Sequence, residues 1–220
     1  MRAAAFYDVD GTLVGTNVIH TYAYYAMNDT TWRSKLSRTT KLIASLPVYA
    51  VADRLGRKYF NDMFYKNYEG LLEDRVWILG EELFEKMIQR RLFRDMIDLI
   101  KRSRAEGYAQ VLVTGAIEQM IAPLAEYLEV DDWYANRLEF HNGKATGRLI
   151  PPVLAGPEKA AFIRRYAIER DLDLNACRAY ADSASDIPML STVGRPVAVN
   201  PDSSLAATAM AHDWPVIRAT

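Results

Sequence analysis

The pattern of apolar and polar positions divides the chain into three zones. Residues 3–9 form a short apolar run that ends in acidic residues and Gly11, which predicts a strand followed by a turn. Between residues 14 and 91 apolar side chains recur at helical spacing with almost no strand pattern, which predicts about four packed helices with an aromatic and aliphatic core. From residue 92 onward, helix and strand patterns alternate.

The third zone carries the signals of six strands and three helices. One helix ends near Gly107, another begins after Gly115, and a third opens at Pro157. A hairpin over residues 137–149 turns at Asn142-Gly143, a dipeptide typical of tight hairpin turns. The other predicted strands are residues 110–114, 177–181, 196–200 and 215–218.

Strands that alternate with helices favour a parallel sheet covered on both faces. We therefore predict an α/β fold with a doubly wound, mostly parallel sheet formed by residues 1–13 and 92–220. The helical zone, residues 14–91, then forms an all-helical domain inserted after the first strand. No internal repeat or low-complexity linker interrupts this organisation.

Composition excludes several classes of protein. With 220 residues, 50% of them hydrophobic and 25% charged, the chain is neither collagen-like, nor disordered, nor a disulfide-stapled mini-protein. A net charge of -1 leaves no global electrostatic signature of nucleic-acid binding. The single Cys177 cannot form an internal disulfide, and no run is long enough to be a signal peptide or a transmembrane segment, so we expect a cytoplasmic protein.

Two features of the helical zone allow alternative interpretations. The apolar stretch 42–52, broken by Pro47, predicts a buried helical segment, although a role at a membrane surface is also consistent with it. Residues 30–68 carry eight basic side chains against the two acids Asp53 and Asp62. This excess of positive charge is compatible both with a solvated helical face and with a patch that attracts an anionic substrate.

Candidate chemistry lies at the predicted carboxyl ends of the strands, where open parallel sheets bind their ligands. The first pair is Asp8 and Asp10, which lie two residues apart and so point the same way from an extended chain. Adjacent carboxylates repel unless a cation lies between them, and Mg²⁺ prefers such oxygen ligands. Either acid alone is also consistent with a cap on the Gly11 turn, whereas the whole pattern D-V-D-G-T is much more specific.

A second pair of acids, Asp182 and Asp186, follows a later strand. Asp182 ends that strand as Asp8 ends the first, so it supplies a candidate third metal ligand. Asp186 precedes Pro188 and is consistent with a helix N-cap, with a hydrogen bond to a metal-bound water, or with both.

Two further candidates are Lys159 and Thr114. Lys159 lies in the first turn of a helix, where the helix dipole slightly disfavours a cation, although an ordinary surface lysine fits the pattern equally well. Thr114 is consistent with a hydroxyl at a helix terminus or with a donor to a phosphate oxygen, beside the amide of Gly115.

These residues, in this order, resemble the haloacid dehalogenase (HAD) superfamily of phosphohydrolases. D-V-D-G-T at residues 8–12 is similar to its first motif, L-V-T-G at residues 112–115 to its second, Lys159 to its third, and A-D-S-A-S-D at residues 181–186 to its fourth. The helical insertion further resembles the phosphoserine-phosphatase-like subgroup, subfamily IB, with its small C1-type cap. The resemblance covers the strand-and-helix core, whereas motifs two and three are weak when taken singly.

The resemblance implies a catalytic role for each matching residue. Asp8 would attack phosphorus and form an aspartyl-phosphate, and Asp10 would act as general acid and then as general base. Thr114, Gly115 and Lys159 would hold the phosphate oxygens, and Lys159 would also keep Asp8 ionised.

The resemblance also implies a metal and a class of substrate. Asp8, Asp182 and the backbone carbonyl of Asp10 would bind Mg²⁺, and Asp186 would order its outer shell. Because Asp10 is present, a phosphatase is favoured over a dehalogenase. Phosphoserine phosphatases carry an acid where this chain has Asn17, so phosphoserine is disfavoured and Asn17 is a candidate substrate-binding residue.

The expected substrate is therefore a small-molecule or lipid-like phosphate ester, with no nucleic-acid partner. Two alternatives remain beside a phosphatase. A phosphotransferase would use the same aspartyl-phosphate, and a non-catalytic sensor of a phosphorylated ligand would use the same pocket.

Overall fold

A computed structural model describes residues 3–220, except for the side chains of residues 53–55, 57 and 58. Residues 1 and 2 therefore lie outside the described part of the predicted core. The same holds for the side chains of Asp53, Arg54, Arg57 and Lys58, which belong to the charged residues counted between positions 30 and 68.

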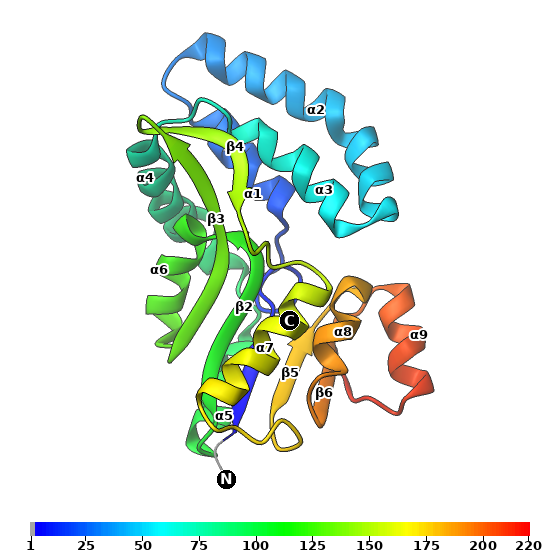
Figure 1. Cartoon of the computed structure of the whole chain (residues 1–220). Helices are drawn as coiled ribbons and strands as arrows, with labels where there is room; N and C mark the ends of the chain where they lie inside the picture. The colour runs from blue at the N-terminus through cyan, green and yellow to red at the C-terminus, as the bar shows by residue number, and fades with distance from the viewer. Residues whose placement is uncertain (1–2) are drawn as a thin grey trace.

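A seven-stranded sheet forms the centre of the fold, in the order β4-β3-β2-β1-β5-β6-β7 (Figure 1). Neighbouring strands are parallel except for the antiparallel hairpin of β3 and β4. The strands are β1 (Ala4–Tyr7), β2 (Ala109–Ile117), β3 (Asp132–His141), β4 (Lys144–Ile150), β5 (Arg178–Ala181), β6 (Arg195–Val199) and β7 (Val216–Ile217). The predicted doubly wound, mostly parallel α/β fold is confirmed.

The central strand β1 is buried on both faces. Ala5 and Tyr7 belong to one hydrophobic cluster, and Ala4 and Phe6 belong to another. This alternation follows from the two-residue period of a strand, and an uninterrupted apolar sequence is what a parallel sheet covered on both sides requires.

Five helices cover the two faces of the sheet. Side chains of α5 (Arg94–Ala105) and α6 (Glu118–Leu128) pack in the cluster of Tyr7. Side chains of α7 (Pro157–Glu169), α8 (Ile187–Leu190) and α9 (Ser203–Ala211) pack in the cluster of Phe6. Figure 1 shows the first pair and the last three on opposite sides of the sheet.

The chain between β1 and α5 is helical, as predicted. It contains α1 (Val18–Met27), α2 (Trp32–Leu55), α3 (Arg57–Phe64), the 3₁₀-helix η1 (Tyr65–Tyr68) and α4 (Glu73–Leu83), which runs into two short irregular turns, η2 (Phe84–Ile88) and η3 (Gln89–Arg91). The hairpin reaches these helices, because Gly70 donates to the carbonyl of Ala145 and Ala145 donates to the carbonyl of Leu71, both at 2.8 Å. One hydrophobic cluster continues from the sheet into this region.

The order of strands reverses direction beside β1. The chain passes from β1 to β2 on one side and later returns to β5 on the other side of β1. Such a reversal opens a crevice at the carboxyl ends of the strands. Asp8 and Asp182 follow these two strands, so the topology brings the first and last acidic motifs to the same crevice.

The prediction that residues 42–52 are buried is wrong. α2 continues through Pro47, and within this stretch only Leu42, Tyr49 and Ala52 are buried. The reason is that α2 lies at the outer end of the molecule and has neighbours along a single stripe, so its other faces meet solvent (Figure 1). Within the described residues, no helix has the length and apolar character needed to cross a bilayer.

Candidate active site

The first motif forms a tight loop at the end of β1. The backbone amide of Asp8 donates to the carbonyl of Tyr180 at 2.9 Å, which anchors it between β1 and β5. The chain then turns, with Leu13 donating to the carbonyl of Val9 at 2.9 Å and Gly11 donating to the carbonyl of Val14 at 2.8 Å. This loop presents the side chain of Asp8 at the carboxyl edge of the sheet.

Gly11 has two reasons to be glycine. Its φ of +81° lies in the left-handed region that other residues rarely adopt. A Cβ atom at this position would also lie 2.1 Å from Oδ2 of Asp182. The absence of a side chain at Gly11 therefore lets the carboxylate of Asp182 approach the loop.

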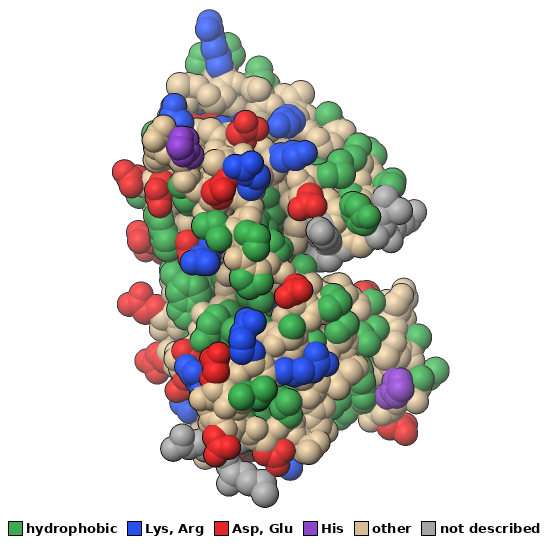
Figure 2. All heavy atoms as spheres, viewed as in Figure 1, with side chains coloured by type: hydrophobic (Ala, Val, Ile, Leu, Met, Phe, Trp, Pro, Cys, Tyr) green, Lys and Arg blue, Asp and Glu red, His purple; other side chains and the backbone are tan. Residues whose placement is uncertain are grey.

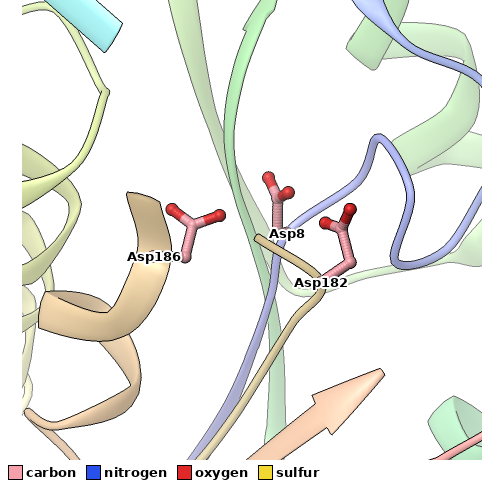
Figure 3. A group of neighbouring side chains, drawn as sticks. All are labelled: Asp8, Asp182 and Asp186. Atoms are coloured by element: carbon pink, nitrogen blue, oxygen red, sulfur yellow. The ribbon is translucent and has the colours of Figure 1, made fainter. Parts of the chain in front are cut away.

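Asp8, Asp182 and Asp186 form an acidic cluster. Each offers a carboxylate oxygen, and these three atoms lie within 4.8 Å of one another. Figure 3 shows Asp8 and Asp182 at the ends of adjacent strands, with Asp186 approaching from the start of a helix. The predicted convergence of the first and last acidic motifs is thus present in the fold.

Lys159 is buried against this cluster, with 4% of its surface exposed. Its Nζ lies 2.7 Å from Oδ1 of Asp8 and 2.9 Å from Oδ1 of Asp186. Although burial by itself lowers the pKa of the Lys159 ammonium, the charges of Asp186 and Asp8 raise that pKa above its ordinary value. Lys159 therefore stays protonated, and the alternative of an ordinary surface lysine is wrong.

The start of α7 explains where Lys159 points. Gly156 adopts a φ of +54° just before the helix, and Pro157 occupies its first turn. The backbone amide of Lys159 donates to the carbonyl of Gly156 at 3.1 Å. The turn directs the lysine inward beneath the carboxyl ends of β1 and β5.

Asp186 pairs with Lys159 and does not act as a side-chain cap. It occupies the N-cap position of α8, but its side chain makes no capping hydrogen bond there. The carboxylate is 2% exposed and lies against Lys159. Of the roles open to Asp186 from the sequence, the N-cap hydrogen bond is not observed.

The electrostatics of the cluster fit a hard divalent cation. Desolvation, and after it the charge of Asp8, raises the pKa of the Asp182 carboxyl to about 8. Three carboxylates face a single ammonium, which leaves excess negative charge in a partly buried place. Oxygen-only donors at this spacing are the set that Mg²⁺ prefers.

Two threonines support the acids, and the sequence analysis gave neither a role. Thr12 donates from Oγ1 to Oδ1 of Asp182 at 3.0 Å. Thr16 donates from Oγ1 to Oδ1 of Asp10 at 3.0 Å. Thr12 belongs to the D-V-D-G-T pattern, which was a usable signal, whereas Thr16 lies beyond that pattern and had none.

Thr114 and Gly115 lie inside β2, which continues to Ile117 beyond the predicted end of this strand. The register of β2 with β3 shifts between Val113 and Ile117, so the ladder is irregular here. Oγ1 of Thr114 accepts from the amide of Ala116 at 3.1 Å, and none of the described residues accepts from its hydroxyl. Because α6 begins only at Glu118, Thr114 is not a helix-terminal residue.

Asn17 lies at the N-terminus of α1. Its Oδ1 accepts from the amides of Ile19 and His20, both at 3.1 Å, which caps the helix. The amide Nδ2 is the group that Asn17 can offer to a ligand.

A single cavity of about 280 Å³ unites the predicted site residues. Its lining includes Asp8, Asp10, Asn17, Thr114, Gly115, Lys159, Asp182 and Asp186. The candidate residues from four separate segments of the chain therefore share one pocket.

The described basic side chains of α2 lie outside this cavity. Arg33, Arg38 and Lys41 line a different cavity, of about 450 Å³, and Lys35 lines neither cavity. The guanidinium of Arg38 already has two partners. Its Nε forms an ion pair with Oδ2 of Asp29 at 2.7 Å, and its Nη1 donates to the carbonyl of Asn67 at 2.8 Å. The position of this basic group favours a solvated or structural role over contact with a ligand at the acidic cluster.

Comparison with known proteins gives consistent matches. A family model described as haloacid dehalogenase-like hydrolase matches residues 5–191. A Mycobacterium tuberculosis protein named phosphoserine phosphatase SerB1 is 32% identical over 98% of this chain and 70% of its own length. The inhibition of morphological differentiation protein of Streptomyces azureus is 30% identical over 98% of this chain and 78% of its own length.

Solved structures share the fold. A Bordetella pertussis protein of unknown function superimposes with a TM-score of 0.84 at 22% identity, covering 99% of each chain. A phosphoserine phosphatase, solved as a phospho-aspartyl intermediate analogue, gives a TM-score of 0.72 at 21% identity over 98% of this chain and 92% of its own.

Proposed function

Because this chain belongs to the haloacid dehalogenase-like hydrolase family, we propose that it is a Mg²⁺-dependent phosphatase that hydrolyses a phosphomonoester through an aspartyl-phosphate on Asp8. The family resemblance predicted from the motifs is confirmed, and the chain is an enzyme of the hydrolase class. The observation that carries the proposal is the buried contact of 2.7 Å between Asp8 and Lys159 at the floor of the cavity.

Asp8 is the proposed nucleophile. Its Oδ1 is held by Lys159, so Oδ2 attacks phosphorus. A bond forms between this oxygen and phosphorus while the bond from phosphorus to the ester oxygen breaks. Lys159 supports the attack because a fixed ammonium keeps Asp8 ionised and offsets the charge of the substrate.

Asp10 is the proposed proton carrier. It lines the cavity, and Thr16 holds its Oδ1 at 3.0 Å. As general acid it protonates the departing alkoxide, and as general base it then takes a proton from the water that attacks the aspartyl-phosphate. That second attack releases inorganic phosphate and regenerates Asp8.

The phosphate oxygens have proposed partners on two other elements. Thr114 donates its hydroxyl, Gly115 its amide, and Lys159 its ammonium. These groups come from β2 and α7, whose packing in the sheet layers keeps them in place without reorganisation.

The side chains of Asp8 and Asp182 and the backbone carbonyl of Asp10 would hold Mg²⁺, with Asp186 ordering its outer shell. When bound, the ion would supply positive charge against the transferring phosphoryl group. Thr12 and Gly11 serve this arrangement by positioning Asp182.

The substrate is proposed to be a small-molecule or lipid-like phosphomonoester in the cytoplasm, where a free thiol such as Cys177 stays reduced. Phosphoserine is a candidate because relatives carry that activity in their names. Asn17 argues against it, since a neutral amide lacks the charge that attracts an ammonium group.

The test is phosphate release from p-nitrophenyl phosphate with Mg²⁺, before and after chelation with EDTA. We expect EDTA to abolish activity reversibly, and Asp8→Asn to lower kcat by about a thousandfold or more. Asp98→Asn, the same change on the exposed face of α5, is the matched control and should retain activity. Full activity in Asp8→Asn would remove Asp8 as nucleophile, and transfer to added glycerol instead of water would identify a phosphotransferase.

A further inference from the structure

A second cavity adjoins the candidate active site. It has a volume of about 1020 Å³ and lies between α3, the segment 151–158 and the turn 184–188. Figure 2 shows the molecule hollowed at this place, with hydrophobic side chains along the lower edge of the hollow. We call this cavity the proline groove, after Pro151, Pro152, Pro157 and Pro188 in its walls.

The proline groove adjoins the catalytic cavity along three shared residues. Ala155, Gly156 and Ser185 line both cavities. Gly156 lies three residues before Lys159, at the start of the same helix. A substrate with its phosphate at Lys159 can therefore extend its alcohol portion past Gly156 into the groove.

The walls of the groove are mostly apolar and rigid. Besides the prolines, they comprise Val153, Ala155, Ala184 and the aromatic ring of Tyr59. Proline rings lose almost no side-chain freedom when a ligand binds, so they favour apolar ligands at a low entropic cost. Such a surface is suited to hydrocarbon.

The described charged side chains that line the two cavities do not favour an amino-acid substrate. Among the described side chains that line them, Lys159 is the sole cation, and Asp8 and Asp186 already hold it. Among the described side chains of the groove, the charged ones are Asp62 and Glu158, both acids. No described lining cation remains for the carboxylate of phosphoserine.

We propose that the proline groove binds the alcohol portion of the substrate, and that the substrates are phosphomonoesters of apolar alcohols. This inference rests on the proposed phosphatase function and assigns its substrate class. Tyr59 and Val153 are then specificity-determining residues, contributed by α3 and by the segment before α7.

The first test is a series of n-alkyl phosphates from ethyl to hexyl, assayed below their micellar concentrations with Mg²⁺, with O-phospho-L-serine as the polar reference. Burial of each methylene should raise kcat/KM about two- to fourfold. The kcat/KM for hexyl phosphate should exceed that for O-phospho-L-serine by about tenfold or more. The same order should appear in calorimetric binding of ethyl and hexyl phosphate to Asp8→Asn, which removes turnover.

Variants of groove residues test whether the dependence of kcat/KM on alkyl length arises in the proline groove. Val153→Asp places a charge in the groove and should lower the ratio of hexyl to ethyl phosphate activity by about tenfold. Tyr59→Ala, at a side chain 61% exposed and thus harmless to folding, should lower the same ratio about threefold. Val48→Asp, the matched change on the exposed side of α2, should leave the ratio unchanged.

The outcomes separate the two proposals. A flat alkyl series, or a preference for phosphoserine, with p-nitrophenyl phosphate still hydrolysed, overturns the groove assignment and leaves the phosphatase proposal standing. Absence of hydrolysis for every ester in the presence of Mg²⁺ overturns both. A rising series that Val153→Asp and Tyr59→Ala both flatten supports the assignment.

Discussion

The strands around β1 and the long helix α2 bury their side chains in opposite ways. All four residues of β1 are buried, because helices cover both faces of the sheet. In α2, by contrast, Trp32 is 69% exposed and Leu36 and Ile43 are each 61% exposed. The sheet region is constrained from every side, whereas this part of the helical region is constrained along one stripe.

In the proposed function, this difference separates the groups that react from the groups that select the substrate. The acids lie just beyond strand ends or at a helix start, Lys159 lies in the first turn of α7, and Thr114 lies inside β2, so the layers of the sheet region hold them in place. The helical region contributes Asn17 to the catalytic cavity and Tyr59 and Asn61 to the proline groove. A fold of this kind can change its substrate by altering the less constrained region without disturbing the reacting groups.

The largest effect on stability and activity is expected at Lys159, in the constrained sheet region. Lys159→Met should lower the free energy of unfolding in EDTA by about 3 kcal/mol, because it leaves Asp8 and Asp186 as buried carboxylates without their ammonium. Phosphatase activity should fall by about a thousandfold in the same variant. Denaturant unfolding measures the free energy of unfolding, with Lys101→Met at an exposed position of α5 as the control. An unfolding free energy equal to that of the parent would show that the ion pairs are not stabilising.

The next prediction concerns the approach of Asp182 to the first motif. Gly11→Ala should weaken the apparent affinity for Mg²⁺ by about ten- to a hundredfold, because the new Cβ displaces the Asp182 carboxylate. A Mg²⁺ titration of activity measures this. Gly107→Ala is a matched control with a φ of +86° and no atom within 4 Å of its Cβ, so it carries the backbone strain without the clash. Equal losses in both variants would attribute the effect to strain.

The third prediction concerns the contact between α4 of the helical region and α6, which covers the sheet. Gly80 of α4 packs directly on α6, and a Cβ there would lie 2.1 Å from the carbonyl oxygen of Gln119. Gly80→Ala should therefore destabilise the protein by about 1 to 3 kcal/mol despite the better helix propensity of alanine. Thermal unfolding measures it, against Glu81→Ala at the adjacent exposed position. A stabilised Gly80→Ala variant would mean that α4 can move away from the sheet layer.

The smallest effect is expected on α2. Ile43→Ala should change the free energy of unfolding by less than about 0.5 kcal/mol, because Ile43 is 61% exposed. Leu42→Ala, one residue earlier and 5% exposed, should cost about 2 kcal/mol. Urea unfolding of the two variants compares them directly. A similar loss at both positions would imply that a partner covers the outer face of α2 in solution.

Much of the fold was predictable because its signals are local. The turn at Asn142-Gly143 has positive φ at both residues, 49° and 70°, as the hairpin prediction requires. The apolar run of β1 and the Pro157 start of α7 also correspond closely to the observed elements. In each case the deciding residues are adjacent in the sequence, so no distant contact was needed.

The errors and open alternatives all depended on distant contacts. The stretch 42–52 is apolar enough to be buried, but burial requires neighbours on every side, and α2 has them along one stripe. The N-cap hydrogen bond expected as one role of Asp186 does not form, and its carboxylate instead pairs with Lys159, a residue 27 positions away. The strand β2 passes Thr114 because β3 continues to pair beside it.

By itself, the sequence determined the order of the elements and the α/β class and singled out the candidate site residues, because strand periodicity, turn residues and a short acidic motif act over a few neighbouring positions. The tertiary structure alone decided that Lys159 is buried between Asp8 and Asp186, that Gly11 makes room for Asp182, and that a proline groove opens beside the catalytic cavity. Distances between segments far apart in the chain arise only when the sheet and its helices pack together, and no local pattern encodes them.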